Sequence, residues 1–280
     1  FGAGWPTMTK TILITGCSSG IGKALALEAK QQGYRVFATA RKEADLAALQ
    51  QLGLETITLE MTNPDSVKQA VLQLQQQAGR LDILVNNAGF GAMGPVLDAG
   101  AEGLRQQFEV NVFALMDLTQ ACLPLLLQNK GLIVNIGSVS GVLTTPFAGV
   151  YCASKAALHS LSDALRMELA PLGVRVLTVQ PGAIDTGFAS RAKLEAEQLL
   201  KADSLWWPMR EGVMLRANAS QNQPTSAESF AKSLMQQLNK ADCSGVVGIG
   251  HGAFTLPLLA RLLPQKWLDK VLSRKFKLVS

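Results

Sequence analysis

The chain has 280 residues, of which 48% are hydrophobic and 17% are charged. This composition excludes a disordered or low-complexity protein, because it provides enough apolar side chains to build a core. The net charge of +5, from 26 basic and 21 acidic residues, is too small and too diffuse to indicate nucleic-acid binding.

Cysteine and histidine are too sparse to indicate a disulfide or a metal site. The four cysteines form no Cys-x-x-Cys pair, and the two histidines have no partner at metal-ligand spacing. We therefore expect reduced thiols, a cytoplasmic setting and no metal. No apolar run approaches 18 residues, so no membrane-spanning helix is expected. Residues 1–8 lack the features of a signal peptide and are interpreted as a disordered start, or as a remnant with Met8 as the natural first residue.

Short apolar strands alternate with helical patterns along the chain. In order, the sequence predicts strand Thr11–Thr15, helix Gly22–Gln32, strand Tyr34–Ala40, helix Leu46–Leu52, strand Glu55–Leu59, helix Ser66–Gln77, strand Leu81–Asn86, helix Ala101–Leu127, strand Leu132–Ile136, helix Tyr151–Ala170, strand Arg175–Gln180 and strand Gly245–Ile249. Continuously apolar strands are typical of a parallel sheet covered on both faces. The pattern predicts an α/β fold with a single doubly wound, Rossmann-like parallel sheet, in one domain over residues 1–280.

Two segments depart from this alternation. Residues 187–224 mix polar runs with the apolar stretch Leu205–Met209, which predicts a substrate-loop insertion over the carboxyl edge of the sheet. Residues 255–280 form a C-terminal helical extension, in which Pro264–Lys277 has the pattern of a basic amphipathic helix. Its apolar stripe comprises Trp267, Leu268, Val271, Leu272 and Phe276. We expect this helix to pack on the domain, with weak peripheral membrane contact as the alternative.

The turn Thr15–Gly22, between the first strand and the first helix, has the spacing G-x3-G-x-G. Glycine permits positive φ and close approach of a ligand to the backbone. The free amides and partial positive charge of the following helix N-terminus suit a pyrophosphate. The turn therefore predicts a dinucleotide site, with a purely structural turn as the alternative.

The end of the second strand indicates which dinucleotide binds. NAD-binding folds place an acidic residue about 20 residues beyond the glycines to hold the ribose 2′-hydroxyl. This chain has Arg41 and Lys42 there, and Arg41 can form a forked contact with a 2′-phosphate. Ser18 of the turn could add a hydroxyl. We interpret this set as a preference for NADP(H), the alternative being a solvated Arg-Lys pair.

A catalytic set is expected near the carboxyl ends of the strands. Tyr151 and Lys155 are four residues apart at the start of a helix, so they share a face. A neighbouring ammonium favours the phenolate and lowers the pKa of a tyrosine from about 10. Ser138 closes a strand, and Asn111 is a polar residue on an apolar helix face. Ligands bind at this edge in such sheets.

With these motifs in their order, residues 9–187 resemble the short-chain dehydrogenase/reductase family. The resemblance rests on the Thr15–Gly22 turn, Asn86–Gly89, Asn111, Ser138, Tyr151 with Lys155, Pro181-Gly182 and Thr186. Ala38–Arg41 and Val150–Lys155 are similar to the branch of 17β-hydroxysteroid dehydrogenases, retinol dehydrogenases and bacterial aldehyde reductases. One departure is Glu60-Met61, where the family usually has Asp then Val beside adenine.

The resemblance implies a mechanism and a set of cofactor contacts. Tyr151 would exchange a proton with the substrate oxygen, Ser138 would hold that oxygen, Lys155 would bind the nicotinamide ribose, and Asn111 would position a water. The implied NADP(H) contacts are Gly16, Ser18, Ser19, Gly20, Ile21, Gly22, Arg41, Lys42, Met61, Asn87, Ala88, Gly89, Tyr151, Lys155, Pro181, Gly182, Ile184 and Thr186.

The substrate side is predicted to be apolar. Candidate walls are Phe90, Met93, Leu143, Phe147, Val150, Phe188 and the Leu205–Met209 stretch. They favour a hydrophobic carbonyl or alcohol of the aldehyde, retinoid or steroid class. An NADP(H)-binding sensor and a lipid-associated protein without turnover are the alternatives.

Assembly and the remaining nucleophilic or titratable side chains give weaker expectations. The family likeness implies a homodimer, formed by helices that carry Phe108, Val112, Leu115, Leu118, Leu161 and Leu165. His159 is expected to be structural and Cys17 a small filler.

Overall fold

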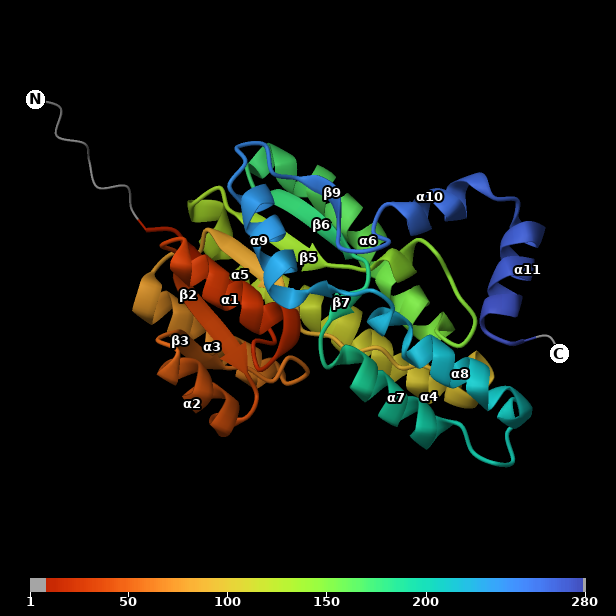
Figure 1. Ribbon diagram of the computed structural model, residues 1–280. Helices are drawn as coiled ribbons and strands as arrows, with labels where there is room; N and C mark the ends of the chain where they lie inside the picture. Colours follow the sequence, from red (N-terminus) through yellow and green to blue (C-terminus); the bar gives the residue numbers. More distant parts are fainter. Residues whose placement is uncertain (1–8, 279–280) are drawn as a thin grey trace, which may run out of the picture.

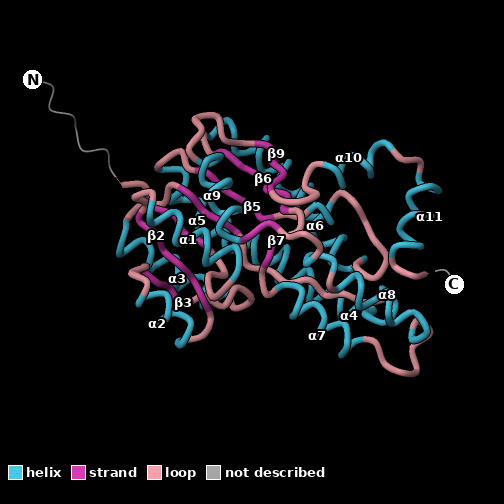
Figure 2. Tube along the Cα trace, viewed as in Figure 1, coloured by secondary structure: helices cyan, strands magenta, loops and turns pink. Residues whose placement is uncertain are grey.

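The computed structural model describes residues 9–278, so the expectations for residues 1–8 lie outside the described part of the chain. Seven parallel strands form one sheet in the order β3-β2-β1-β4-β5-β6-β9, with helices on both faces (Figures 1 and 2). The predicted doubly wound sheet is therefore confirmed. The strands are β1 Thr11–Ile14, β2 Arg35–Ala40, β3 Glu55–Thr58, β4 Ile83–Asn86, β5 Leu132–Ile136, β6 Arg175–Pro181 and β9 Gly245–Ile249. A separate parallel pair, β7 Ile184–Asp185 with β8 Thr225–Ser226, was not predicted.

The helices agree with the predicted order, and the main difference lies beyond residue 187. They are α1 Gly20–Gln31, α2 Glu43–Gln51, α3 Pro64–Ala78, α4 Val96–Phe108, α5 Ala114–Gln128, α6 Gly149–Leu169, α7 Phe188–Leu199, α8 Arg210–Ala217, α9 Ala227–Leu238, α10 Thr255–Leu262 and α11 Gln265–Lys275. The α2 helix begins three residues before its predicted start, with Glu43 and Asp45 in its first turn. Acidic side chains stabilise that end of a helix.

Two apolar clusters hold the helices to the sheet. Because side chains alternate along a strand, Ile12 of β1 joins one cluster and Leu13 joins the other. The first cluster includes Phe230 of α9, and the second includes Leu74 of α3 and Leu118 of α5, all completely buried. Burial of each such side chain contributes about 1.5–3 kcal/mol. The two clusters fix the sheet, and thus its carboxyl edge, as a rigid platform.

The long helix predicted over Ala101–Leu127 is interrupted. It begins earlier, at Val96, and a π-helical segment at Glu109–Phe113 separates α4 from α5. Single π turns inside α-helices are frequent at functional sites, and this one contains Asn111. By length and composition alone, Val96–Gln128 could cross a membrane, which the count of consecutive apolar residues did not indicate. Half of its most apolar window is buried in this fold, as in the core helix of a globular domain.

Three of the apolar residues expected at a dimer interface are instead part of this chain's own interior. Val112, Leu115 and Leu118 are each at most 3% exposed. They therefore cannot be counted as interface residues, whereas Leu161 of α6 is 39% exposed. The sequence pattern did not separate the two cases, because both kinds of contact select apolar side chains.

The predicted insertion at residues 187–224 is largely helical, because it contains α7 and α8, and the sequence analysis did not predict these helices. The buried face of α7 consists of Ala189, Ala192 and Ala196, whose small side chains give a weak apolar pattern. A third apolar cluster joins α6, α7, α8 and Phe276 at the end of the chain. The region is thus a packed helical cap beside the carboxyl edge of the sheet.

The stripe predicted on the C-terminal helix does not form one buried face. Phe276 is buried and Leu272 packs beside it, but Trp267 is 67% exposed and Val271 is 52% exposed. Lys277 pairs with Glu211 of α8. The helix is therefore attached through its C-terminal end, and Figure 1 shows α10 and α11 extending away from the sheet.

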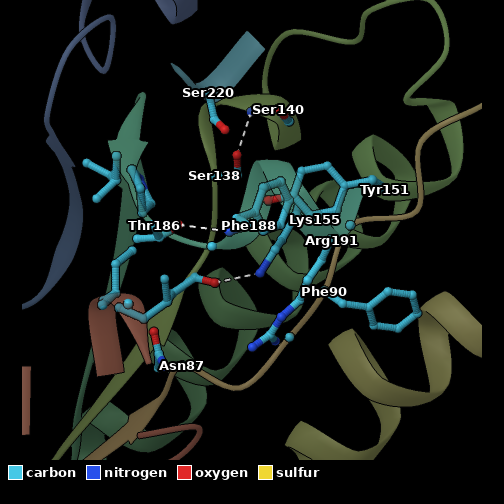
Figure 3. A pocket seen from close by; sticks show the side chains of 18 of the residues that line it. Asn87, Phe90, Ser138, Ser140, Tyr151, Lys155, Thr186, Phe188, Arg191 and Ser220 are labelled. Atoms are coloured by element: carbon cyan, nitrogen blue, oxygen red, sulfur yellow. Dashed lines mark hydrogen bonds between the residues drawn. The ribbon is translucent and has the colours of Figure 1, made fainter. Parts of the chain in front are cut away.

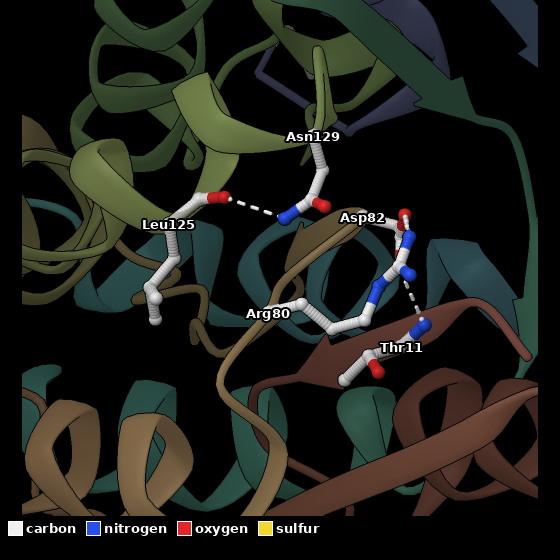
Figure 4. A network of polar contacts seen from close by, with 5 residues as sticks. All are labelled: Thr11, Arg80, Asp82, Leu125 and Asn129. Atoms are coloured by element: carbon white, nitrogen blue, oxygen red, sulfur yellow. Dashed lines mark hydrogen bonds and ion pairs between the residues drawn. The ribbon is translucent and has the colours of Figure 1, made fainter. Parts of the chain in front are cut away.

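A charged contact ties the opposite, amino edge of the sheet together (Figure 4). The Asp82 carboxylate accepts hydrogen bonds from Arg80 Nη2 at 2.6 Å, Arg80 Nε at 3.0 Å and the Thr11 backbone N–H at 2.7 Å. Forked arginine–carboxylate contacts are geometrically specific. This contact joins the starts of β1 and β4, far from the carboxyl ends where the site lies.

Candidate active site

A cleft of about 980 Å³ lies along the carboxyl ends of the strands (Figure 3). Every cofactor contact implied by the sequence lines it except Gly22. Ser138, Tyr151 and Lys155 line it as well, whereas Asn111 does not. Residues at or just beyond the carboxyl ends of all seven strands of the main sheet therefore converge with residues of the helical cap on one cavity, although they are spread over more than 200 positions of the chain.

The glycine turn is closed and shaped by its neighbours. Gly16 and Gly20 have φ of +71° and +58°, which side chains other than glycine rarely adopt. A Cβ on Gly22 would collide with the Gly16 carbonyl oxygen, so Gly22 serves close packing rather than ligand contact. Asn87 Nδ2 donates to the Thr15 carbonyl oxygen at 2.8 Å and holds the turn against the end of β4. The turn thus presents the N-terminus of α1 to the cleft.

Arg191 of α7 also reaches the glycine turn, and the sequence analysis missed it. Its Nη2 donates to Ser19 Oγ at 3.3 Å, and both residues line the cleft. The side chain stands beside the helix N-terminus that suits a pyrophosphate. The two residues are 172 positions apart, so no local pattern could have paired them.

Arg41 lies at the end of β2 with Lys42 beside it on the cleft wall. Arg41 Nη1 is 3.6 Å from Glu60 Oε2, and the two side chains are 68% and 42% exposed. Exposed ion pairs of this kind contribute little, at most about 1 kcal/mol. Arg41 therefore remains available to an incoming anion.

Ser138 follows β5 and is fixed through its backbone and its hydroxyl. Its Oγ accepts from the Ser140 backbone N–H at 3.0 Å, and its own N–H donates to His159 Nε2 at 3.3 Å. The His159 ring packs against Gly137 and Gly141, where no side chain would fit. Burial and the nearby Lys155 charge lower the pKa of His159 to about 4, so the ring is neutral at pH 7 and can accept this hydrogen bond. His159 is thus structural, as expected.

Tyr151 and Lys155 occupy adjacent turns of α6, and both are buried. Lys155 Nζ donates to the Ile136 carbonyl oxygen at 2.7 Å and lies 6.0 Å from the Tyr151 ring centre. Burial lowers the pKa of Lys155 to about 8. Burial raises the pKa of Tyr151, and only the Ser138 hydroxyl and the Arg216 charge oppose that rise. The net shift of the Tyr151 pKa is therefore upward, opposite to the expected lowering, because burial outweighs the opposing groups, and Lys155 is not among the groups that act on it.

Asn111 lies behind the cleft wall. Its Nδ2 donates to the Phe90 carbonyl oxygen at 3.0 Å and to Ser154 Oγ at 3.1 Å. A Cβ placed on Gly89 would be 3.0 Å from Asn111 Oδ1 and 3.9 Å from Lys155 Nζ. Asn111 Oδ1 and Lys155 Nζ thus both lie next to Gly89, and the π-helical turn places Asn111 at this position.

The apolar residues that line the cleft are only partly those that the sequence predicts. Phe90, Met93, Leu143 and Phe188 line it as expected. Phe147, Val150 and the Leu205–Met209 stretch do not line it, and Leu205 is 84% exposed. The walls that the sequence analysis missed are Leu256, Leu272 and Phe276 from the C-terminal extension and Arg216 from α8.

The four cysteines of the chain are free and buried. Burial raises the pKa of the Cys17 thiol to about 12, and its Sγ donates to the Ile14 carbonyl oxygen at 3.2 Å. Cys17 is therefore a filler in the turn and not a nucleophile.

Comparison with known proteins finds relatives over most of the chain. The family described as short chain dehydrogenase matches residues 10–197. A short-chain dehydrogenase of Talaromyces islandicus is 43% identical over 182 residues, which make up 64% of this chain and 64%, just under two thirds, of that protein. A short-chain dehydrogenase/reductase of Pestalotiopsis microspora is 34% identical over 95% of this chain and 93% of its own length. The NADPH-dependent 1-acyldihydroxyacetone phosphate reductase of Schizosaccharomyces pombe is 35% identical over 82% of this chain and 78% of its own length.

Solved structures match the complete architecture. A short-chain dehydrogenase from Streptomyces avermitilis superimposes with a TM-score of 0.79 at 28% identity, covering 98% of this chain and 97% of that one. A short-chain dehydrogenase/reductase from Burkholderia phymatum, solved with NAD, gives a TM-score of 0.77 at 26% identity, with 95% of each chain covered. A short chain dehydrogenase from Burkholderia cenocepacia, solved with NADP, gives a TM-score of 0.74 at 25% identity, covering 94% of this chain and 97% of that one.

Proposed function

This chain is an oxidoreductase of the short-chain dehydrogenase family, and we propose that it transfers a hydride between NADP(H) and an apolar carbonyl or alcohol. The observation that carries the proposal is the convergence of Ser138, Tyr151 and Lys155 with the glycine turn on one cleft. The apolar walls favour an aldehyde, a retinoid or a steroid as the substrate class. We place the enzyme in the cytoplasm, as its four buried free thiols suggest.

Each catalytic side chain has a distinct part in the proposed reaction. When bound, NADP(H) supplies or accepts the hydride. Tyr151, protonated because burial raises its pKa, gives its phenolic proton to the carbonyl oxygen during reduction. Ser138 donates a hydrogen bond to the same oxygen and stabilises its developing charge. Lys155 remains largely protonated at pH 7, since its pKa is lowered only to about 8, and its ammonium would hold the nicotinamide ribose when the cofactor is bound.

The preference for NADP(H) rests on Arg41 and Lys42. No acidic residue follows β2 in the position that would hold a ribose 2′-hydroxyl, and Arg41 is held only by a weak surface pair with Glu60. A 2′-phosphate would compete well for this guanidinium, because forked charged hydrogen bonds are strong. The relative from Schizosaccharomyces pombe is named as NADPH-dependent, which supports the assignment.

We also propose a homodimer. The exposed apolar residues Phe113 of the π-helical turn, at 52%, and Leu161 and Met167 of α6, at 39% and 61%, are candidates for its interface. An isologous contact across a two-fold axis would cover the same residues on both copies.

The direct test is a spectrophotometric assay of NADPH and NADH oxidation with aldehydes, retinal and ketosteroids. We expect turnover with at least one of these classes and a higher kcat/KM with NADPH. The Tyr151→Phe variant, which retains the ring but loses the transferable proton, serves as the control. Binding of NADPH without turnover across the whole panel would contradict the proposed reaction and favour a sensor.

A further inference from the structure

Arg216 of α8 is a buried cation without an acidic partner in the described part of the chain. The side chain is 8% exposed and lines the substrate part of the cleft. Among residues 9–278 it forms no ion pair with Asp or Glu. Arginine is almost never this buried unless it is paired, because an uncompensated charge loses its hydration.

The neighbours of Arg216 orient its guanidinium without neutralising it. Nε donates to Thr145 Oγ1 at 2.6 Å, and Nη2 donates to Ser140 Oγ at 3.3 Å. Both acceptors are uncharged hydroxyls of the segment between β5 and α6. A guanidinium has five N–H donors in a planar fork, so this orientation leaves donors for another group.

The place of Arg216 connects it to the reacting end of the cleft. Ser140, which accepts from Arg216, donates its backbone N–H to Ser138 Oγ at 3.0 Å. The charge of Arg216 is also close enough to Tyr151 to act on its ionisation. A group bound by Arg216 would therefore lie a few bonds from a carbonyl held by Ser138 and Tyr151.

A second polar group on this wall has no partner. Ser220 Oγ is buried and forms no hydrogen bond within the described chain. Ser220 lines the same cleft, four residues after Arg216, and in Figure 3 its hydroxyl points toward Ser138 and Ser140. A buried hydroxyl without a partner costs free energy unless a ligand completes it.

Glu195, the acidic residue of the cleft that is nearest to Arg216 in the sequence, does not serve as its counterion. Glu195 of α7 also lines the cavity, and its Oε2 is buried without a hydrogen-bond partner among residues 9–278. The cation that acts on Glu195 is Arg191, whereas the groups beside Arg216 are the Cys152 thiol and the Tyr151 phenol. Within residues 9–278, Glu195 and Arg216 form no ion pair, so Glu195 does not neutralise Arg216.

We propose that Arg216 and Ser220 form an anion subsite, so that the substrate is an amphiphile with a carboxylate or a phosphate close to its carbonyl. This inference rests on the proposed function, because it assigns a substrate class to the same cleft. The apolar walls Met93, Leu143, Phe188, Leu272 and Phe276 hold the hydrocarbon part of that substrate. The anion supplies the counterion that Arg216 lacks among the described residues, and it offsets the free-energy cost of burying the guanidinium.

Matched pairs of ketones test the subsite on the wild-type enzyme with NADPH. One pair is 4-oxodecanoic acid and its methyl ester, and the other is 1-hydroxydecan-2-one and its phosphate monoester. We expect kcat/KM to be about tenfold to a hundredfold higher for the charged member of at least one pair, the value of a charged hydrogen bond. The pair that shows the effect identifies carboxylate or phosphate. Preference for the uncharged member in both pairs would overturn the inference without any variant.

Variants then assign the preference to Arg216. Arg216→Met should reduce the charged-to-uncharged ratio of kcat/KM at least tenfold, Arg216→Lys should retain part of it, and Ser220→Ala should reduce it less. Arg210→Met is the matched control, because Arg210 lies on the same helix but is exposed and stacks on Trp207. An equal loss for both members of a pair would show that Arg216 only supports Tyr151, and would overturn the subsite.

A binding measurement separates this inference from the proposed function. Titration calorimetry of the NADP⁺-loaded enzyme with 4-oxodecanoic acid and its methyl ester does not require turnover. Tighter binding of the acid by wild type, lost in Arg216→Met, supports the subsite even if no ketone is reduced. Equal binding of the acid and the ester, together with turnover of both, would refute the subsite and leave the oxidoreductase function intact.

Discussion

The neutral His159 ring under Ser138 makes the protein sensitive to mild acid. Burial lowers its pKa to about 4 from an ordinary value of 6.5, so the unfolded chain takes up this proton at higher pH than the folded chain. The stabilisation is present above pH 6.5 and is lost as the pH falls toward 4. Proton linkage with these two values gives a loss of about 2 kcal/mol between pH 7 and pH 5.

The assay is urea unfolding followed by tryptophan fluorescence at pH 7, 6 and 5, at one protein concentration. His159→Gln keeps a hydrogen-bond acceptor but does not titrate. Its free energy of unfolding should therefore fall less between pH 7 and pH 5 than that of wild type, by about 2 kcal/mol. His251→Gln, at an exposed histidine, should behave as wild type. Equal losses in wild type and His159→Gln would refute the assignment of a partly buried, neutral ring.

The remaining predictions address catalysis, cofactor choice, assembly and the C-terminus. Tyr151→Phe should lower kcat about 10²–10⁴-fold with NADPH affinity near wild type, and a loss under threefold would reject its role as the proton donor. Arg41→Asp should reduce the NADPH-to-NADH ratio of kcat/KM about tenfold to a hundredfold, and a wild-type preference for NADH would contradict this. Light scattering at micromolar concentration should give a dimer mass, and a monomer mass would exclude it. Truncation after Leu263 should lower the melting temperature, because it removes the buried Phe276. An unchanged melting temperature with lost, salt-sensitive binding to anionic liposomes would instead make the helix a membrane anchor.

Parts of the fold and site that depend on local pattern were predictable from the sequence. The seven strands of the main sheet lie within two residues of their predicted bounds, because a strand buried on both faces is a continuous apolar run. The glycine turn and the Tyr151–Lys155 pair depend on spacing along one turn or one helix, and both line the cleft. Even the amphipathic end of the chain was recognisable, although not which of its apolar residues would be buried.

The sequence alone thus determined the sheet, the family and the candidate residues Ser138, Tyr151 and Lys155 that line the cleft, since each of these rests on motifs of a few consecutive positions. The tertiary structure alone decided what surrounds them. It places Arg191 on a turn 172 residues away, Arg216 beside a hydroxyl 76 residues away, and Phe276 in the cleft wall. It also decided the direction of the Tyr151 pKa, because removal from water outweighs the nearby charges. Burial and long-range contact are properties of the packed chain, and no local pattern of residues reports them.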